Sequence, residues 1–585
     1  MARRIVIIFV LHVLFVPIGA AEAHANLVRS TPAAGALLDA APKELVLEYT
    51  EELDPSFTRV QLLNSQNQVI EPGPGAIDPA APKVLRLALG DLPNDSYTAI
   101  YRARSAVDGH VSEGSVPFGV GVAATTGSLI PAPGTPDPAT LPPAPLDAAA
   151  RWLNLLVAAL ALGGLPFALL VWRPALRAAT KDEGRRTNDR KHLTAESLGP
   201  SSLDFRPLVA DDAITRFIRR LMVLGGLLFL LTNTLFLLSQ AATAAGVSPA
   251  QALGAPALAL LGSRTGQLIL VRGALMLLLL ALAWRLPPAG RGPAWPWWAA
   301  LALAGGVVLT FSLNSHGAAQ PQGATLAIAL DWLHIAAMVA WLGGLIPLLF
   351  AIHAARRTPE QALPLAILIP RFSWLSAPCV ALLILTGVYS YLLHVNRLDL
   401  LAATTYGRAL SIKLGLFGLL LMLGAVNLAL LSPRLRTPSK RLVRSFGRSV
   451  RAELIAGALL LLGVGAMTSV APSQTAWEAH QQLGLAQEVS TGDVDLVLRV
   501  APARIGDNEW AVDVIDNRPG AQAAPAKVLL RFDMLGMAMG QLQTEAKPTT
   551  QERYAARGSF TSMGGRWNVE VILRRAGFDD VQHTF

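Results

Sequence analysis

Hydrophobic and polar residues alternate with a period of two over roughly residues 24–120 of the chain. Two stretches show it clearly: Leu45, Leu47 and Tyr49 alternate with Glu44, Glu48 and Thr50, and Tyr97, Ala99 and Tyr101 alternate with Thr98, Arg102 and Arg104. Such short alternating runs between turn residues predict strands and together favour a small β-sandwich. A similar pattern predicts strands of a second small β-sandwich near the C-terminus, at residues 494–500, 510–515, 527–532 and 567–573.

Between these two β regions the pattern changes to long apolar stretches. Each is long enough to cross a bilayer as a helix. We expect eight membrane spans, at about residues 150–172, 218–243, 265–285, 294–314, 325–352, 372–394, 408–431 and 452–471. The composition agrees, because the 585 residues are 52% hydrophobic and only 15% charged. Much of the chain therefore lies in lipid, and its fold class is a multidomain one with an α-helical transmembrane bundle.

The basic residues indicate the orientation of the spans. Every second loop is rich in Lys and Arg, and the loops between them hold almost none. The basic loops are 173–220, 285–291, 356–357 and 434–451, and the others are 244–263, 315–324 and 395–407. Basic loops stay in the cytoplasm. We therefore expect a bacterial inner-membrane protein with both terminal domains in the periplasm, and the net charge of +9 needs no nucleic-acid partner.

The first residues are typical of a signal peptide. Arg3 and Arg4 precede an apolar run, and Ala21-Glu22-Ala23 forms a small-x-small cleavage site before His24. The alternative is an uncleaved anchor helix, which would leave the amine of His24 in a peptide bond. The expected domains are a signal peptide at 1–23, a β-sandwich at 24–120, a Pro/Ala-rich linker at 121–147, the membrane domain at 148–472 and a periplasmic β domain at 473–585.

Two histidines in the first domain could form a metal site. Cu(II) prefers nitrogen and oxygen donors in a tetragonal plane, and a free N-terminal amine can chelate it together with the imidazole of the same residue. Cleavage would give His24 this role. Asp108 and His110 are two residues apart, so they face one way on an extended strand, and Gly109 permits close backbone approach. Alone, a motif such as Asp108-Gly109-His110 is more often a turn than a set of metal ligands.

The first domain resembles the CopC copper-resistance family. The resemblance rests on three runs: His24-Ala25-Asn26-Leu27-Val28-Arg29-Ser30-Thr31-Pro32, Leu47-Glu48-Tyr49-Thr50-Glu51 and Val107-Asp108-Gly109-His110-Val111-Ser112. It implies a cupredoxin-like β-sandwich in which the amine and imidazole of His24, Asp108 and His110 bind Cu(II). Glu51 matches an acidic position near that metal, as a secondary or outer-shell group, or it is an exposed carboxylate at a strand end. The domain has no methionine for a Cu(I) site.

Three histidines fall near the expected periplasmic side of the membrane spans: His316, His334 and His394. Polar residues inside a bilayer are costly and usually mark a pathway. Asp331, His334 and Met338 share one helical face, with hard, intermediate and soft donors in order of depth, as a copper route would need. The alternative is a hydrogen bond between Asp331 and His334, with Met338 as packing.

Residues 150–472 resemble the CopD copper-resistance family. The matching runs are Ser315-His316-Gly317, Leu333-His334-Ile335-Ala336-Ala337, Trp341-Leu342-Gly343-Gly344, Arg371-Phe372-Ser373, Thr386-Gly387-Val388-Tyr389 and Tyr406-Gly407-Arg408. The resemblance implies copper uptake across the inner membrane. Family members more often have a Gly-His pair where this chain has Ser315-His316. The sequence contains no nucleotide-binding loop and no CPC-type motif, so nothing in it indicates energy coupling.

The C-terminal domain contains a cluster of methionines. Met534, Met537 and Met539 lie within six residues, and Met563 follows further on. Thioethers favour Cu(I), so a Cu(I) loop is one interpretation, and hydrophobic packing is the other. This domain resembles the YtkA-like family over about residues 490–575.

These patterns predict a non-enzymatic protein that captures periplasmic Cu(II), from periplasmic copper donors or solution, and passes copper through the membrane bundle. Two alternatives remain: copper sequestration without transport, and a haem-type electron-transfer protein with His316, His334 and His394 as axial ligands. A copper mono-oxygenase is disfavoured, because an aspartate on the metal and the lack of a flat aromatic surface do not suit oxygen activation.

Overall fold

The structure is a computed structural model of the chain. It describes residues 25–33, 36–66, 68–70, 75–122, 137, 139–181, 206–320, 323–357, 363–436, 439–483, 485–491, 494–501, 503, 506–516, 527–534, 541–549, 553–561, 567–575 and 579–585. The chain forms two compact units. One contains Ser105–His110 and Pro142–Gln474, and the other contains Ala25–Arg104, Val111–Leu141 and Thr475–Phe585.

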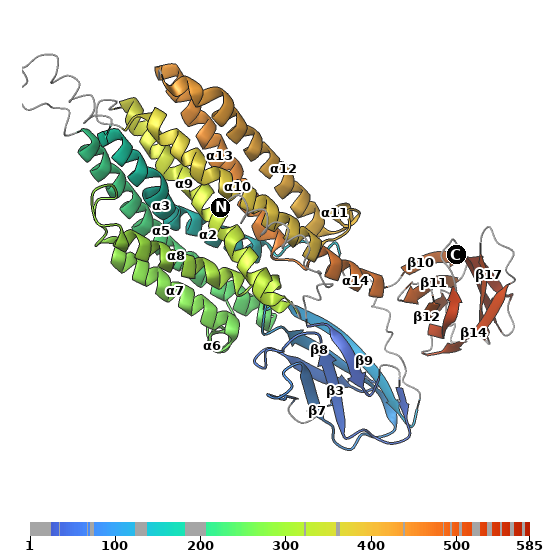
Figure 1. The fold of residues 1–585 in the computed structure, drawn as a ribbon. Coiled ribbons are helices and arrows are strands. Elements are labelled where there is room, and N and C mark those ends of the chain that lie inside the picture. Colours follow the sequence, from blue (N-terminus) through green and yellow to red (C-terminus); the bar gives the residue numbers. More distant parts are fainter. Residues whose placement is uncertain are drawn as a thin grey trace, which may run out of the picture. The chain divides into compact units, whose positions relative to one another are not determined.

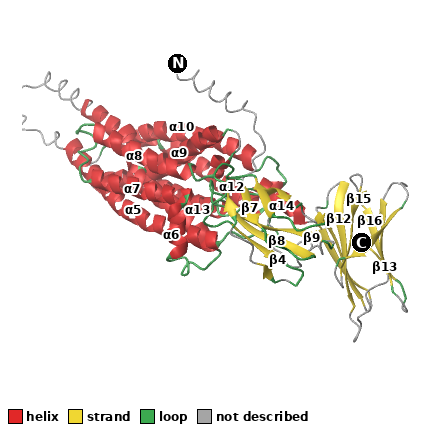
Figure 2. Ribbon diagram, turned by 90° about the horizontal axis from the view of Figure 1, so that it is seen from below, coloured by secondary structure: helices red, strands yellow, loops and turns green. Residues whose placement is uncertain are grey.

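The described strands of the N-terminal β domain form two sheets, as expected for the predicted β-sandwich (Figure 2). One sheet has the order β1-β3-β7-β6 and the other β2-β9-β8-β4-β5. The strands are β1 Leu27–Thr31, β2 Ala36–Leu38, β3 Glu44–Tyr49, β4 Arg59–Leu63, β5 Val69–Ile70, β6 Ala76–Ile77, β7 Val84–Ala88, β8 Asp95–Arg104 and β9 Val111–Val120. Leu45, Leu47 and Tyr49 of β3 are buried, so this strand places every second side chain in the core.

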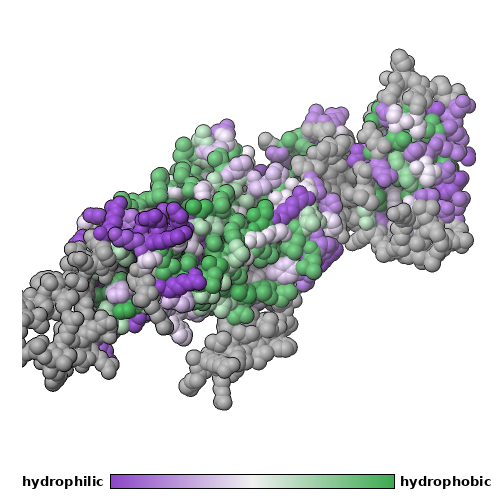
Figure 3. Space-filling view, turned by 90° about the horizontal axis from the view of Figure 1, so that it is seen from above, coloured by the Kyte–Doolittle hydropathy of each residue, from purple (hydrophilic) through white to green (hydrophobic). Residues whose placement is uncertain are grey.

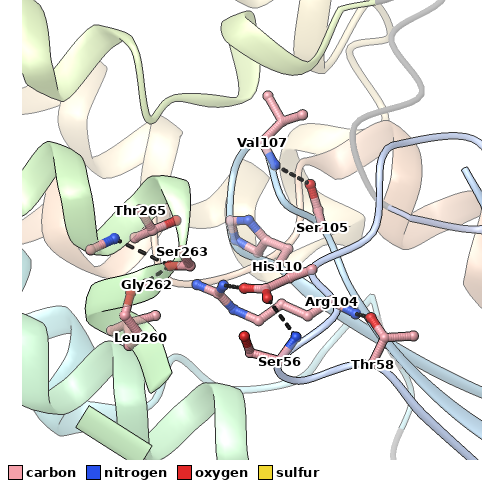
Figure 4. A network of polar contacts seen from close by, with 12 residues as sticks. Ser56, Thr58, Arg104, Ser105, Val107, His110, Leu260, Gly262, Ser263 and Thr265 are labelled. Carbon is pink, nitrogen blue, oxygen red and sulfur yellow. Dashed lines mark hydrogen bonds and ion pairs between the residues drawn. The ribbon is translucent and has the colours of Figure 1, made fainter. Parts of the chain in front are cut away.

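Arg104 does not follow the alternation. It was assigned to the polar face of β8, but its side chain is 1% exposed and forms a buried ion pair with Asp54. Asp54 Oδ1 also accepts a hydrogen bond from the Ser56 amide at 3.0 Å, and the Arg104 amide donates to Thr58 Oγ1 at 3.2 Å (Figure 4). These contacts fix the end of β8, from which the loop with Asp108 and His110 begins.

The central part of the chain has eight helices long and apolar enough to cross a membrane, among the residues described (Figure 1). They cover Pro145–Lys181, Ala210–Ala245, Arg264–Ala283, Trp295–Ser312, Ala324–Arg357, Leu365–His394, Thr405–Leu431 and Lys440–Met467. This confirms the eight predicted spans and a multi-pass membrane protein. Apolar side chains, green in Figure 3, cover much of the visible helical surface, as lipid contact requires.

Several shorter elements interrupt or join these spans, and the hydropathy pattern did not predict them. The helical elements of the bundle are α2 Pro145–Leu162, α3 Gly164–Pro166, η1 Phe167–Trp172, α5 Arg206–Ala245, α6 Ala255–Gly262, α7 Arg264–Ala283, α8 Trp295–Ser312, η2 His316–Ala319, α9 Ala324–Arg357, α10 Leu365–His394, α11 Leu400–Ala403, α12 Thr405–Val426, η4 Asn427–Leu431, η5 Pro433–Arg436 and α13 Lys440–Met467. The short turn η2 matters most, because it carries His316 between α8 and α9.

Helices α2 and α9 approach each other closely at a pair of glycines. A Cβ atom on Gly343 would lie 2.3 Å from the Ala159 carbonyl oxygen and 2.8 Å from the Gly163 Cα atom. Contacts this close between backbones are how small residues hold membrane helices together, since apolar burial gives no driving force in lipid. Gly343 therefore sets the position of α9, the helix that carries Asp331 and His334.

Replacing Gly343 with valine should destabilise the bundle by about 1–3 kcal/mol, because the added side chain overpacks a backbone contact. Thermal unfolding of the purified protein in detergent, followed by tryptophan fluorescence, would show a lower unfolding temperature. Gly415→Val on α12 is the matched control, because a Cβ at Gly415 has no atom within 4 Å. Equal unfolding temperatures for the two variants would contradict this view of the α2–α9 contact.

The C-terminal domain begins with a helix that the sequence pattern did not predict, α14 Ser473–Leu483. The described strands are β10 Leu485–Thr491, β11 Val494–Ala501, β12 Gly506–Asp516, β13 Lys527–Met534, β14 Leu542–Pro548, β15 Arg553–Thr561, β16 Trp567–Arg574 and β17 Val581–Thr584. Strand β14 pairs with both β13 and β15, so all eight belong to one antiparallel sheet. The four predicted strands are confirmed, as parts of β11, β12, β13 and β16.

Candidate metal centre

The loop Ser105–His110 is a tight turn held by its own hydrogen bonds. The Ser105 amide donates to the His110 carbonyl at 2.8 Å, and Ser105 Oγ accepts from the amide of Asp108 at 3.3 Å. Ser105 Oγ also accepts from the Val107 amide at 3.1 Å (Figure 4). The His110 amide donates to Asp108 Oδ1 at 3.0 Å. Gly109 has a φ of 79°, a left-handed conformation that glycine adopts without strain. The turn therefore fixes one carboxylate oxygen and leaves the other, Oδ2, for other partners.

Asp108 Oδ2 lies between two imidazoles. It is 3.3 Å from His110 Nδ1 and 3.1 Å from His316 Nδ1. One ligand atom from each of the three residues lies within 4.8 Å of the others, an arrangement that could hold a metal ion. The ring centroids of His110 and His316 are 4.5 Å apart. We call Asp108, His110 and His316 the outer trio. Its donors, a carboxylate and two imidazoles, are the kinds that Cu(II) prefers.

The electrostatics of the outer trio favour the forms that bind metal. Burial alone would raise the pKa of Asp108, but the charges and hydrogen bonds of His110 and His316 hold that pKa well below its usual range. Burial, and then the neighbouring His110, lower the pKa of His316. At neutral pH, Asp108 is therefore an ionised carboxylate and His316 a neutral imidazole, which are the states that a metal requires.

His24 lies outside the described residues, and the structure fixes the chain just after it. Ala25 is 1% exposed, and its carbonyl accepts a hydrogen bond from Ser112 Oγ. The Asn26 amide donates to Thr50 Oγ1 at 3.0 Å. The first described residue is thus bonded to a residue only two positions after His110. Glu51, the predicted secondary ligand, is 3% exposed. It is not the exposed strand-end carboxylate of the alternative interpretation.

His394, the last residue of α10, lies beside the outer trio. Its ring centroid is 5.9 Å from that of His316, at an interplanar angle of 67°. The side chain is buried, at 8% exposure. Of the three membrane histidines, His316 and His394 are therefore close together at the end of the bundle.

His334 lies deeper, on α9, where it contacts α10. Its Nδ1 atom is 2.8 Å from Thr386 Oγ1, and the Thr386 hydroxyl donates to the Leu382 carbonyl at 2.6 Å. A hydroxyl has one proton, so Thr386 accepts a hydrogen bond from an Nδ1–H of His334. This leaves the Nε2 lone pair as the free donor of the ring, in the manner of metal-ligating histidines whose other nitrogen is held by a partner.

The other predicted membrane residues lie on the same helix. Asp331 is one turn before His334 on α9 and interacts electrostatically with Lys413 of α12, and Met338 is partly buried one turn beyond His334. The hydrogen bond that the structure gives the His334 ring thus goes to Thr386 and not to Asp331. In the C-terminal domain, Met534 ends β13, but its side chain and the residues Met537, Met539 and Met563 lie outside the described part of the chain.

Sequence reasoning missed two features of this site. In the sequence, Thr386 is only part of a run that resembles the CopD family, although a hydroxyl in a membrane span is itself a signal of a polar contact. The contact between His316 and Asp108 joins residues 208 positions apart, and no local pattern reveals such a pair.

Comparison with known proteins shows which families the chain matches. It matches the models of three families: the CopC domain over residues 27–121, the copper resistance protein D-like N-terminal domain over 143–325, and copper resistance protein D over 366–467. The chain belongs to the CopC and CopD copper-resistance proteins. It is a fusion of both in one chain, so the resemblances to the CopC and CopD families seen in the sequence are confirmed.

Several relatives are similar to this CopC–CopD fusion. The copper transport protein CutJ of Bacillus subtilis (strain 168) is 25% identical over 99% of the chain and 98% of CutJ. Copper resistance protein D of Pseudomonas syringae pv. tomato is 29% identical over 30% of the chain and 60% of that protein. Protein YobA of Escherichia coli (strain K12) is 32% identical over 17% of the chain and 79% of YobA. The crystal structure of CopC from Methylosinus trichosporium OB3b is 29% identical over 17% of the chain and 93% of that structure, with a TM-score of 0.16.

Proposed function

We propose that this CopC–CopD fusion captures copper on the periplasmic face of the bacterial inner membrane and transports it into the cell. The observation that carries the proposal is the outer trio. Asp108 and His110, in the CopC part of the sequence, have ligand atoms within 4.8 Å of one from His316, in the CopD part. A copper ion held there is bound by both parts at once and has a direct way from one to the other.

The first step is capture of Cu(II), from solution or from a periplasmic copper donor. Cleavage after Ala23 would free the amine of His24, which directly precedes Ala25, the residue whose carbonyl accepts a hydrogen bond from Ser112. The amine and imidazole of His24 with Asp108 and His110 would make a four-donor set, with Glu51 as an outer-shell group. Mass spectrometry of the mature N-terminus tests the cleavage.

The later steps run through the bundle. His394 lies next to His316 at the end of the bundle. His334, Asp331 and Met338 follow along α9. Their nitrogen, oxygen and sulfur atoms can bind copper, which apolar side chains cannot do. The relative CutJ, which matches nearly the whole chain, is named a copper transport protein. The basic loops support an orientation with both terminal domains in the periplasm. Met534, Met537, Met539 and Met563 are the proposed Cu(I) donors of the C-terminal domain.

The capture step predicts a loss of Cu(II) binding in Asp108→Asn. The amide keeps the size of the side chain but loses its charge, so the full-length protein in detergent should bind Cu(II) at least about tenfold more weakly. Electron paramagnetic resonance during a Cu(II) titration measures this. Asp91→Asn, an exposed carboxylate in the same domain, is the control. An unchanged spectrum and affinity in Asp108→Asn would refute capture at the outer trio.

A further inference from the structure

His394 has an unexplained buried nitrogen. Its Nδ1 atom has no hydrogen-bond partner within the described part of the chain, and the side chain is only 8% exposed. Buried polar atoms in proteins almost always have a partner, so an exception needs an explanation. A nitrogen with a free lone pair in a buried place is also what a metal ion requires of a ligand.

The neighbour of His394 is a second imidazole. The rings of His316 and His394 meet edge to face, with centroids 5.9 Å apart. Metal ions bind imidazole nitrogen at about 2.0–2.1 Å, so this separation leaves room for one ion between a nitrogen of each ring once the rings turn those nitrogens toward each other. We call His316 and His394 the inner pair.

The inner pair differs from the outer trio in its donors. Asp108 supplies a negative oxygen to the outer trio, whereas the ring contact that the structure gives His394 is with the imidazole of His316. The inner pair itself offers two imidazole nitrogens, which make a two-coordinate site. Cu(I) accepts such a site, whereas Cu(II) favours four donors in a plane.

We propose that His316 and His394 form a second copper site, one that binds Cu(I) and shares His316 with the outer trio. This inference rests on the proposed function, because it places the inner pair directly after the outer trio on the copper route. Because His316 cannot serve both sites fully at once, copper bound to the inner pair loses its contact with Asp108 and His110. Cu(II) from the outer trio must first become Cu(I), for which an external thiol reductant supplies one electron per ion; two thiols form one disulfide and release two protons for every two ions. The shared histidine then passes one Cu(I) ion at a time toward α10.

The next donor along this route is His334. Thr386, its hydrogen-bond partner, precedes His394 on α10 by eight residues, or about 12 Å at 1.5 Å per residue. The inner pair therefore fills the gap between the loop that carries Asp108 and the middle of the bundle.

Competition titration of Cu(I) tests the proposal on the full-length protein in detergent, with Asp108→Asn and His110→Ala present to disable the outer trio. Adding His394→Leu should remove one equivalent of Cu(I) binding or weaken it at least tenfold. His394→Met, which offers a thioether, should restore that equivalent, and His353→Ala, an exposed histidine on α9, should change nothing.

Unchanged Cu(I) binding in His394→Leu would overturn the inner pair, and so would His394→Met binding no better than His394→Leu. Failure of the proposed function gives a different result. The loss caused by His394→Leu would then still be seen, while cells expressing the wild-type protein would accumulate no more copper than cells without it.

Discussion

Cells that express the His316→Ala variant are expected to accumulate copper at no more than about a tenth of the wild-type rate. His316 joins Asp108 to the membrane bundle at 3.1 Å, so its removal breaks the contact that links the outer trio to His394. Loss of a directly bound ligand should cost at least as much as the roughly 10–100-fold that loss of an outer-shell partner costs. Copper content of washed cells, measured by mass spectrometry over time, gives the rate.

The control for this variant is His353→Ala, which removes an exposed imidazole at the other end of α9. Its accumulation rate should equal that of the wild type at equal protein level. A His316→Ala variant that accumulates copper as fast as His353→Ala would show that the outer trio is not on the route.

The second large effect is expected for His334→Ala. This substitution removes the Nε2 donor in the middle of the route, and copper accumulation should again fall about tenfold or more. Cu(II) binding at the outer trio, measured by electron paramagnetic resonance, should stay unchanged. The variant thereby separates capture from passage through the bundle.

Thr386 provides a sharper version of the same test. Thr386→Ser keeps the hydroxyl that accepts the His334 Nδ1–H, and Thr386→Val keeps the shape without it. Only the valine variant should slow copper accumulation, because its His334 is no longer held with Nε2 as the free donor. Equal rates in the serine and valine variants would contradict this role of the hydroxyl, although His334 itself could remain on the route.

Much of the fold follows from the sequence. Strands such as β3 alternate between buried residues and half-buried or exposed ones, and apolar runs of twenty or more residues rarely form anything but membrane helices. The structural features that the sequence did not predict have physical causes. Arg104 was assigned to the polar face because its partner Asp54 is fifty residues away, and α14 is too polar and too short to stand out beside the strands that follow it.

The residues of the candidate site could also be predicted only in part from the sequence. Asp108 and His110 were found together because they are two residues apart on a loop. His316 was singled out as a polar residue at the end of a span, but its position beside Asp108 depends on how separate parts of the chain pack. The hydrogen bond that orients His334 depends on a hydroxyl from another helix, and no spacing along α9 could reveal it.

The most direct test of the account is copper flux into proteoliposomes that contain the purified protein. The account predicts that wild-type protein admits copper faster than empty liposomes, and that His316→Ala and His334→Ala both return the rate to the empty-liposome level. Wild-type liposomes that bind copper on the outside but admit none would contradict transport. They would leave a protein that only sequesters the metal.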